Sequence, residues 1–197
     1  MSSSYQQVEV ASRAEWRAWL ERHHACSPGL WLVTFKKSIG ARHVPYGDVV
    51  EEALCFGWVD SRGRKLDAAR SQLLVTPRKP RSNWSRANKQ RVARLLAAGV
   101  MAPAGCAAVE VAVANGAWTA LDAVEDLVEP DDLRVALDGR PAARPAWDGF
   151  PRSARRGILE WIGKAKRAET RARRVEETAR LAAQGIRANQ WRQPKRS

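Results

Sequence analysis

Apolar positions in the first half of the chain recur at helical spacing in some segments and form short β-rich runs in others. Ser12 precedes Glu15 at the spacing of a capping box, and a stripe of tryptophan and leucine at helical spacing follows. β-branched and aromatic residues are concentrated at residues 30–37, and two further runs at 58–65 and 69–76 read as strands joined by a turn. These patterns predict a small antiparallel sheet of about three strands.

Helix start and stop signals surround these runs. Pro45 suits the first turn of a helix that Gly57 ends, and Ser85 suits the N-cap of another. The rest of the chain is helical in pattern, except for a segment rich in Pro, Ala and Gly at residues 139–151. The predicted fold class is therefore α+β, a small antiparallel sheet of about three strands with a helical C-terminal half.

The same patterns predict how the chain is divided. We expect an α+β core domain over residues 12–140, a long C-terminal helix over residues 151–186 that packs on it, and a basic tail over residues 187–197. Residues 1–11 are expected to form a short tail or an edge strand. A length of 197 residues suits one compact domain, or a domain with a helical extension.

Positive charge is concentrated in two segments. The formal net charge is +13. Eleven Lys and Arg residues occur from Arg62 to Arg94 against the single acidic Asp67, and nine occur from Arg152 to Arg174 against two glutamates. A concentrated basic surface attracts nucleic acid, anionic lipid or an acidic ligand. The alternative is that the Arg- and Ala-rich composition reflects a GC-rich genome.

Cysteine usage and hydropathy bear on the compartment. The three cysteines are an odd number without CxxC spacing, which argues against a disulfide framework and for a reducing compartment. The chain has no apolar run long enough to cross a membrane. We therefore expect a cytoplasmic protein without membrane insertion. No metal site and no cofactor is predicted, because His23, His24 and Cys26 lack a second pair of ligands.

The stretch of residues 54–88 combines aromatic rings, a carboxylate, hydroxyls and many cations. Strand alternation places Asp60 on one face with Trp58 and Arg62. A carboxylate beside an aromatic ring can act as a general base or accept a hydrogen bond, whereas the alternative is a structural ion pair with arginine. In residues 77–85, prolines extend the backbone, and arginine with tryptophan can grip a planar group; the alternative is a capped loop with solvated charges.

On the predicted long helix, one arginine lies beside the apolar stripe and is singled out for that reason. Asp60 is the predicted catalytic residue. The predicted ligand-binding residues are Trp31, Lys37, Tyr46, Trp58, Arg78, Ser82, Trp84 and Arg171.

Three successive motifs have the same order as in a known family. They are LCFGWVDS at residues 54–61, TPRKPRSNWS at 76–85 and WIGKAKRAETRARR at 161–174. On these motifs the chain resembles the YdeI/OmpD-associated family, also called the bacteriocin-protection or OmdA-like family, over about residues 12–185. The resemblance implies a compact cytosolic bacterial protein. The family's names suggest protection against bacteriocins or cationic antimicrobial peptides and association with an outer-membrane porin, and the resemblance carries over no catalytic residues.

Three functions are compatible with these observations. The favoured one is a resistance or stress-protection protein that sequesters a small-molecule or peptide toxin in an aromatic and basic pocket. The second is a hydrolase-like enzyme that inactivates an electrophilic toxin with Asp60 as general base. The third is a non-specific nucleic-acid binder, favoured by the sequence pI of about 10.6 but without a recognised nucleic-acid motif.

Overall fold

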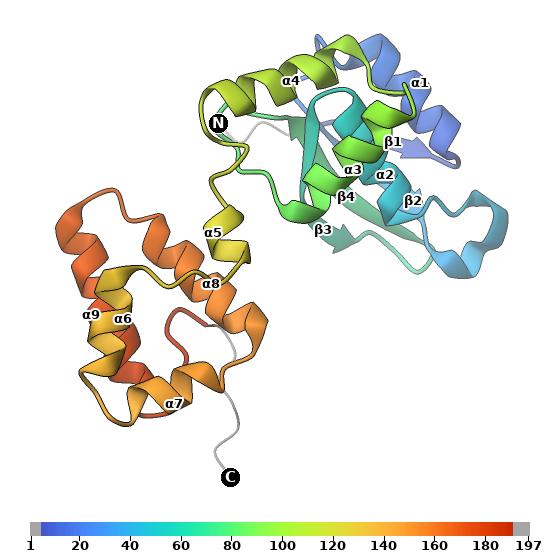
Figure 1. The fold of residues 1–197 in the computed structure, drawn as a ribbon. Helices are drawn as coiled ribbons and strands as arrows, with labels where there is room; N and C mark the ends of the chain where they lie inside the picture. Colours follow the sequence, from blue (N-terminus) through green and yellow to red (C-terminus); the bar gives the residue numbers. More distant parts are fainter. Residues whose placement is uncertain (1–4, 191–197) are drawn as a thin grey trace. The chain divides into compact units, whose positions relative to one another are not determined.

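A computed structural model describes residues 5–190 and divides the chain into two compact units (Figure 1). The N-terminal unit comprises residues 1–120 and the C-terminal unit residues 121–197. Each unit has its own cluster of buried apolar residues. Each is therefore described by itself.

The N-terminal unit is built on a four-stranded mixed sheet with the strand order β1-β2-β4-β3. The strands are β1 (Gln7–Val10), β2 (Leu30–Phe35), β3 (Trp58–Lys65) and β4 (Arg70–Pro77). β1 lies parallel to β2, and the other pairs are antiparallel. The α+β class is confirmed, and the edge-strand alternative for residues 1–11 supplies the fourth strand that the predicted sheet lacked.

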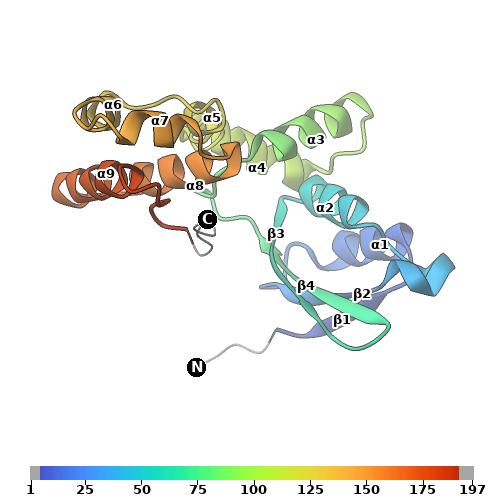
Figure 2. The same ribbon diagram turned by 90° about the horizontal axis from the view of Figure 1, so that it is seen from below.

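Helices cover one face of this sheet. They are α1 (Arg13–His23) and α2 (Tyr46–Cys55), which lie on the same side of the strands (Figure 2), with a 3-10 helix η1 (Lys37–Arg42) before α2. α3 (Arg86–Ala97) and α4 (Pro103–Ala114) complete the unit. Both predicted serine caps are present.

The caps have the expected local geometry. Ser12 Oγ accepts a hydrogen bond from the Glu15 amide at 3.2 Å. Ser85 Oγ accepts one from the Asn88 amide at 3.3 Å. Each cap satisfies an amide at the start of a helix that would otherwise have no intrahelical partner.

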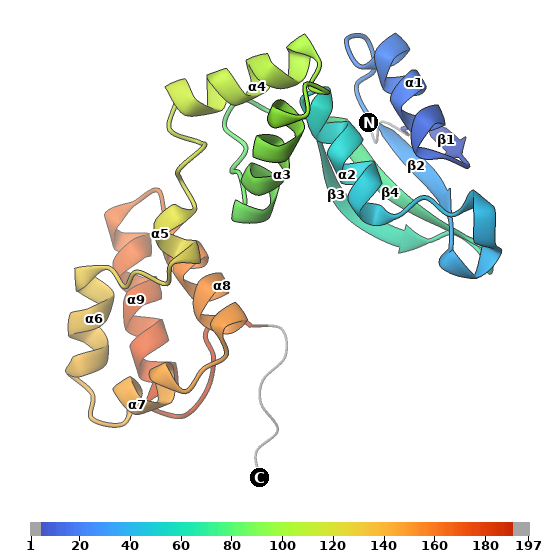
Figure 3. The same cartoon turned by 45° about the vertical axis from the view of Figure 1, so that its right-hand side comes forward.

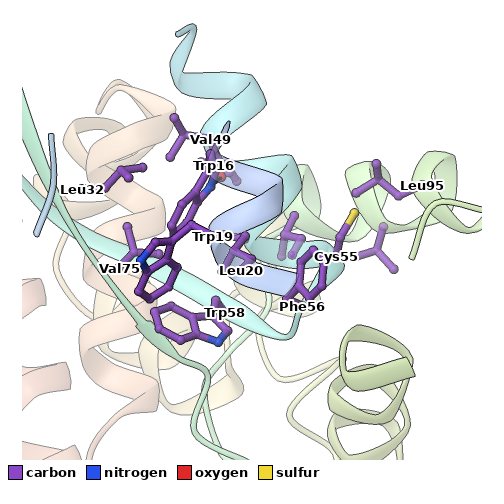
Figure 4. Packing of buried hydrophobic residues seen from close by; sticks show 14 of the residues in the cluster. Trp16, Trp19, Leu20, Leu32, Val49, Cys55, Phe56, Trp58, Val75 and Leu95 are labelled. Atoms are coloured by element: carbon purple, nitrogen blue, oxygen red, sulfur yellow. Dashed lines mark hydrogen bonds between the residues drawn. The ribbon is translucent and has the colours of Figure 1, made fainter. Parts of the chain in front are cut away.

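Tryptophans occupy the centre of the N-terminal core (Figure 4). The rings of Trp16 and Trp19 stack at 5.6 Å between centroids, and Trp19 meets the edge of Trp58 at 5.8 Å. Their polar atoms are satisfied: Trp16 Nε1 donates to the Val49 carbonyl at 3.1 Å, and Trp58 Nε1 donates to the His24 carbonyl at 3.2 Å. These contacts anchor α1 to the start of α2 and to the sheet.

The C-terminal unit is entirely helical in the described residues. Its helices are α5 (Asp122–Glu125), α6 (Asp131–Asp138), α7 (Ala143–Asp148), α8 (Arg152–Gly163) and α9 (Ala168–Ala182). α6, α7 and α8 each pack against α9, and Figure 3 shows α6, α8 and α9 next to one another. No helix within residues 5–190 has the length and apolarity needed to span a membrane.

The structure differs from the predicted organisation in this half. Residues 151–186 form two helices, because Arg167 has an extended backbone (φ −109°, ψ 140°) between α8 and α9. Buried residues from both helices face one core, so the chain must turn between them. The predicted linker at 139–151 contains α7, whose Trp147 is fully buried. In the predicted tail, Ala188 is buried in the same core, and residues 191–197 lie outside the described residues.

Candidate functional site

A cavity of about 540 Å³ lies in the N-terminal unit, between the sheet and the segment that leads into α2. Thr34 and Ser71 are paired across β2 and β4 and both line it, together with Gly63 of β3. These side chains are small, and the helical cover of α2 begins only at Tyr46. Short side chains under the start of a helix therefore leave the space open.

Two predicted site residues meet at the wall of this cavity. The Tyr46 hydroxyl donates a hydrogen bond to Asp60 Oδ2 at 2.7 Å. Burial, followed by the hydrogen bond to Asp60 and by its charge, raises the pKa of Tyr46 to about 12, although Arg91 opposes the shift. The phenol is thus a proton donor at neutral pH, and it holds the Asp60 carboxylate in a defined orientation.

Asp60 forms no ion pair in the part of the chain that the structure describes. The alternative of a structural ion pair with arginine is therefore not found there. A shift of register between Asp60 and Gly63 interrupts the strand alternation that we expected to continue to Arg62. The second oxygen of Asp60 makes no hydrogen bond within residues 5–190, and the Asp60 side chain lines the cavity.

His43 is a cavity residue that the sequence analysis missed. Its Nδ1 lies 2.8 Å from the Phe35 carbonyl oxygen. A carbonyl only accepts, so Nδ1 carries the proton and Nε2 of the neutral ring is an acceptor. A single histidine in a loop has no motif that marks it. The structure positions His43 through an isolated β-bridge with Phe35. Such a bridge is a tertiary contact, so the sequence around His43 does not predict it.

Cations also border the cavity. Lys36 Nζ donates to the carbonyls of Asp67 and Ala68 at 2.7 and 2.9 Å. The Arg64 guanidinium lies 4.1 Å from the centroid of the Trp31 ring. The cavity therefore combines a phenol and a carboxylate with hydroxyls, an imidazole and two cations. That mixture can orient a small molecule that carries both donors and an anionic group.

Seven of the nine predicted site residues do not line this cavity. Trp58 is 1% exposed and belongs to the core. Trp31 is buried beneath Arg62 and Arg64, whose guanidinium carbons lie 5.7 and 4.1 Å from its ring centroid. Lys37 is exposed at the start of η1.

We expected Arg78 and Trp84 to bind a planar ligand by stacking and cation–π contact. In the structure these two side chains contact each other. The Arg78 guanidinium carbon lies 3.8 Å from the Trp84 ring centroid, and Trp84 is 1% exposed. Nη1 of Arg78 donates to the Asn83 carbonyl at 3.0 Å. The Ser82 amide donates to the Lys79 carbonyl and closes the turn before Trp84.

Arg171 belongs to the C-terminal unit, where it joins α9 to α6. Its Nε and Nη2 donate to the two carboxylate oxygens of Asp132 at 2.7 and 2.9 Å. Hydrogen bonding to Arg171 holds the pKa of Asp132 below its usual value. The arrangement is a bidentate pair within the unit.

We expect Arg171→Ala to lower the stability of the C-terminal unit by at most about 1 kcal/mol, since both side chains are partly exposed. Because the pKa of Asp132 is lower in the folded state, the stabilisation is present above its unfolded pKa and is lost as the pH falls through the folded one. Urea unfolding at neutral and acidic pH measures this, with the exposed Arg173→Ala as control. An equal loss at both pH values would contradict the role of the Asp132 pair.

No group of three or more His, Cys, Asp or Glu side chains suited to a metal ion occurs within the described residues.

Two family models match the chain. Residues 8–108, more than half of the sequence, match a model described as a domain of unknown function, DUF8412. Residues 126–185 match a model described as "Bacteriocin-protection, YdeI or OmpD-Associated". Neither a curated protein nor a solved structure matches. The cavity lies in the part matched by the first model, and α6 to α9 lie in the part matched by the second.

Proposed function

We propose a function on the premise that this chain belongs to the DUF8412 family through residues 8–108 and to the bacteriocin-protection, YdeI or OmpD-associated family through residues 126–185. The proposed function is protection of the host by sequestration of a small toxic molecule. The predicted resemblance to the second family is confirmed, over a shorter range than the expected 12–185. A role related to bacteriocin protection is what that family suggests.

The observation that carries the proposal is the Tyr46–Asp60 pair in the wall of the cavity. The ligand would donate a hydrogen bond to the remaining oxygen of Asp60, and Lys36 and Arg64 would favour an anionic group at the border. The volume of about 540 Å³ is within the range of small-molecule sites. Sequestration requires no chemical step.

Native mass spectrometry of the protein purified from its own host tests the proposal. We expect a retained small molecule, and at least roughly tenfold less of it in Tyr46→Phe and Asp60→Asn, because a hydrogen bond to a charged group contributes about 1.5–3 kcal/mol. Tyr5→Phe is the matched control, since Tyr5 is the other tyrosine of the chain and does not line the cavity. Equal retention in all variants would place the ligand elsewhere, and an empty wild type would count against high-affinity sequestration.

The second candidate is hydrolase-like inactivation of an electrophilic toxin with Asp60 as general base. The observation in its favour is that His43, with Nε2 as an acceptor, lines the same cavity. Incubating a host toxin with substoichiometric protein separates the two functions. Complete chemical conversion of the toxin, lost in Asp60→Asn, would support turnover, whereas protection that ends at one equivalent supports sequestration.

A further inference from the structure

Arg78 is a half-buried cation that no carboxylate in the described part of the chain contacts directly, although the charge of Asp60 acts on it. Within residues 5–190 no carboxylate forms an ion pair with it, and its Nε is buried without a hydrogen-bond acceptor. Arg13 and Arg144, in contrast, each contact several carboxylates. Removing a charge from water without a compensating partner is costly, so the surroundings of Arg78 favour an anion.

Arg78 also lines a second cavity. Its volume is about 270 Å³, and Arg78 and Lys79 line it together with Gly57 and the alanines Ala104, Ala107 and Ala108 of α4. None of these residues lines the cavity of Tyr46 and Asp60. The volume is below that of typical drug-sized sites, so a ligand here must be small.

The position of Arg78 is held by the protein itself. The guanidinium is held in place by its cation–π contact with the Trp84 ring and by its hydrogen bond to the Asn83 carbonyl. The backbone is held as well, because the Arg78 amide donates to the Gly57 carbonyl at 2.9 Å. A planar fork that is already ordered loses little entropy when it binds an oxyanion. Lys79 is exposed at the same cavity and adds a second positive charge.

We propose that this second cavity is a separate ligand site, in which Arg78 and Lys79 bind the oxyanion of a small phosphate or carboxylate compound and the alanines of α4 contact its apolar part. The electrostatics agree with this assignment. Burial lowers the pKa of Arg78 to about 10. The charge of Asp60 raises this pKa but does not bring it back to the ordinary value of an arginine. A bound anion would compensate the burial.

Proton–nitrogen correlation spectra of the full chain test the site at a single atom. Inorganic phosphate and propionate are titrated separately at constant ionic strength, and the Arg78 Nε–H signal is identified by its loss in Arg78→Lys. We expect that signal and the amides of Gly57 and Lys79 to shift saturably with at least one probe. Saturation with phosphate alone indicates that the ligand carries a phosphate group, and saturation with propionate alone indicates a carboxylate. Saturation with both probes indicates that the site recognises oxyanions of either kind.

A blocking variant serves as the second measurement. Ala107 is exposed on α4, so Ala107→Leu fills the cavity without removing the guanidinium or disturbing the core. We expect at least tenfold weaker binding in Ala107→Leu and unchanged binding in Ala114→Leu, since Ala114 is also an exposed alanine of α4 but does not line this cavity. Three results would contradict the proposed second site: shifts that do not saturate, shifts that are equal at all exposed cations, and shifts that persist in Ala107→Leu. Each of them would do so independently of the outcome at the Tyr46 cavity.

Discussion

Replacing Gly105 with alanine is expected to destabilise the N-terminal unit by about 3 kcal/mol, because a buried contact with no free space cannot accept an added methyl group without moving the backbone. A Cβ atom at Gly105 would lie 2.2 Å from the Cys55 carbonyl oxygen and 2.9 Å from that of Leu54. All three nearest atoms are backbone atoms at the end of α2, so no side chain can rotate away. The hydrogen bond from the Ala102 amide to the Cys55 carbonyl, now 3.0 Å, would be strained as α4 moved.

Gly47→Ala is the matched control for this variant. Gly47 is also helical, but its added Cβ would have no atom within 4 Å. We expect a gain of about 0.5 kcal/mol, because alanine restricts the unfolded chain more than glycine does. Urea unfolding of the two variants measures both changes. A Gly105→Ala protein within about 0.5 kcal/mol of the wild type would contradict the close approach of α4 to α2.

Features that depend on a few neighbouring residues could be predicted from the sequence. Ser12 and Ser85 cap helices because the side chain and the amide it binds are three residues apart. Asp60 and Tyr46 also meet, although they come from a strand and a helix 14 residues apart. Both were predicted as site residues, but their hydrogen bond to each other was not, since Tyr46 lies outside the stretch of residues 54–88.

Tryptophans show where the sequence is ambiguous. A tryptophan ring can stack on a ligand or fill a core, and its spacing in the chain does not distinguish the two. Trp58 and Trp84 are each buried by partners that are distant in the sequence or that lie in another element. Arg171 is a similar case, because its partner Asp132 is 39 residues away.

The division of residues 151–186 into two helices could not be predicted from periodicity either. The apolar positions of α8 and α9 continue one helical pattern, and residues 164–167 contain neither proline nor glycine. The turn is required because both helices face the same core, which is a property of packing. β1 was uncertain for a related reason, since a strand of four residues is stabilised mainly by its parallel pairing with β2.

Trp147→Ala is expected to remove about 4 kcal/mol from the stability of the C-terminal unit. Trp147 is fully buried, its ring meets Phe150 at 6.2 Å, and its Nε1 donates to Glu129 Oε1 at 2.7 Å. A unit of this length has roughly 4–10 kcal/mol in total, at about 0.05–0.15 kcal/mol per residue. A loss of about 4 kcal/mol is therefore a large share of the unit's stability, and Glu129 would lose the hydrogen bond from Trp147 while keeping its ion pair with Arg144.

Because the two units have separate cores, the loss should be confined to residues 121–190. Urea unfolding of Trp147→Ala should resolve two transitions, and amide spectra recorded between them should keep the signals of the sheet and lose the dispersion of α6 to α9. Trp161→Ala is the control: this half-buried tryptophan lies 4.9 Å from the Arg174 guanidinium, and its loss should cost about 1 kcal/mol. If Trp147→Ala instead unfolded the whole chain in one transition, the units would be energetically coupled, which would contradict the expectation that each core is stable by itself.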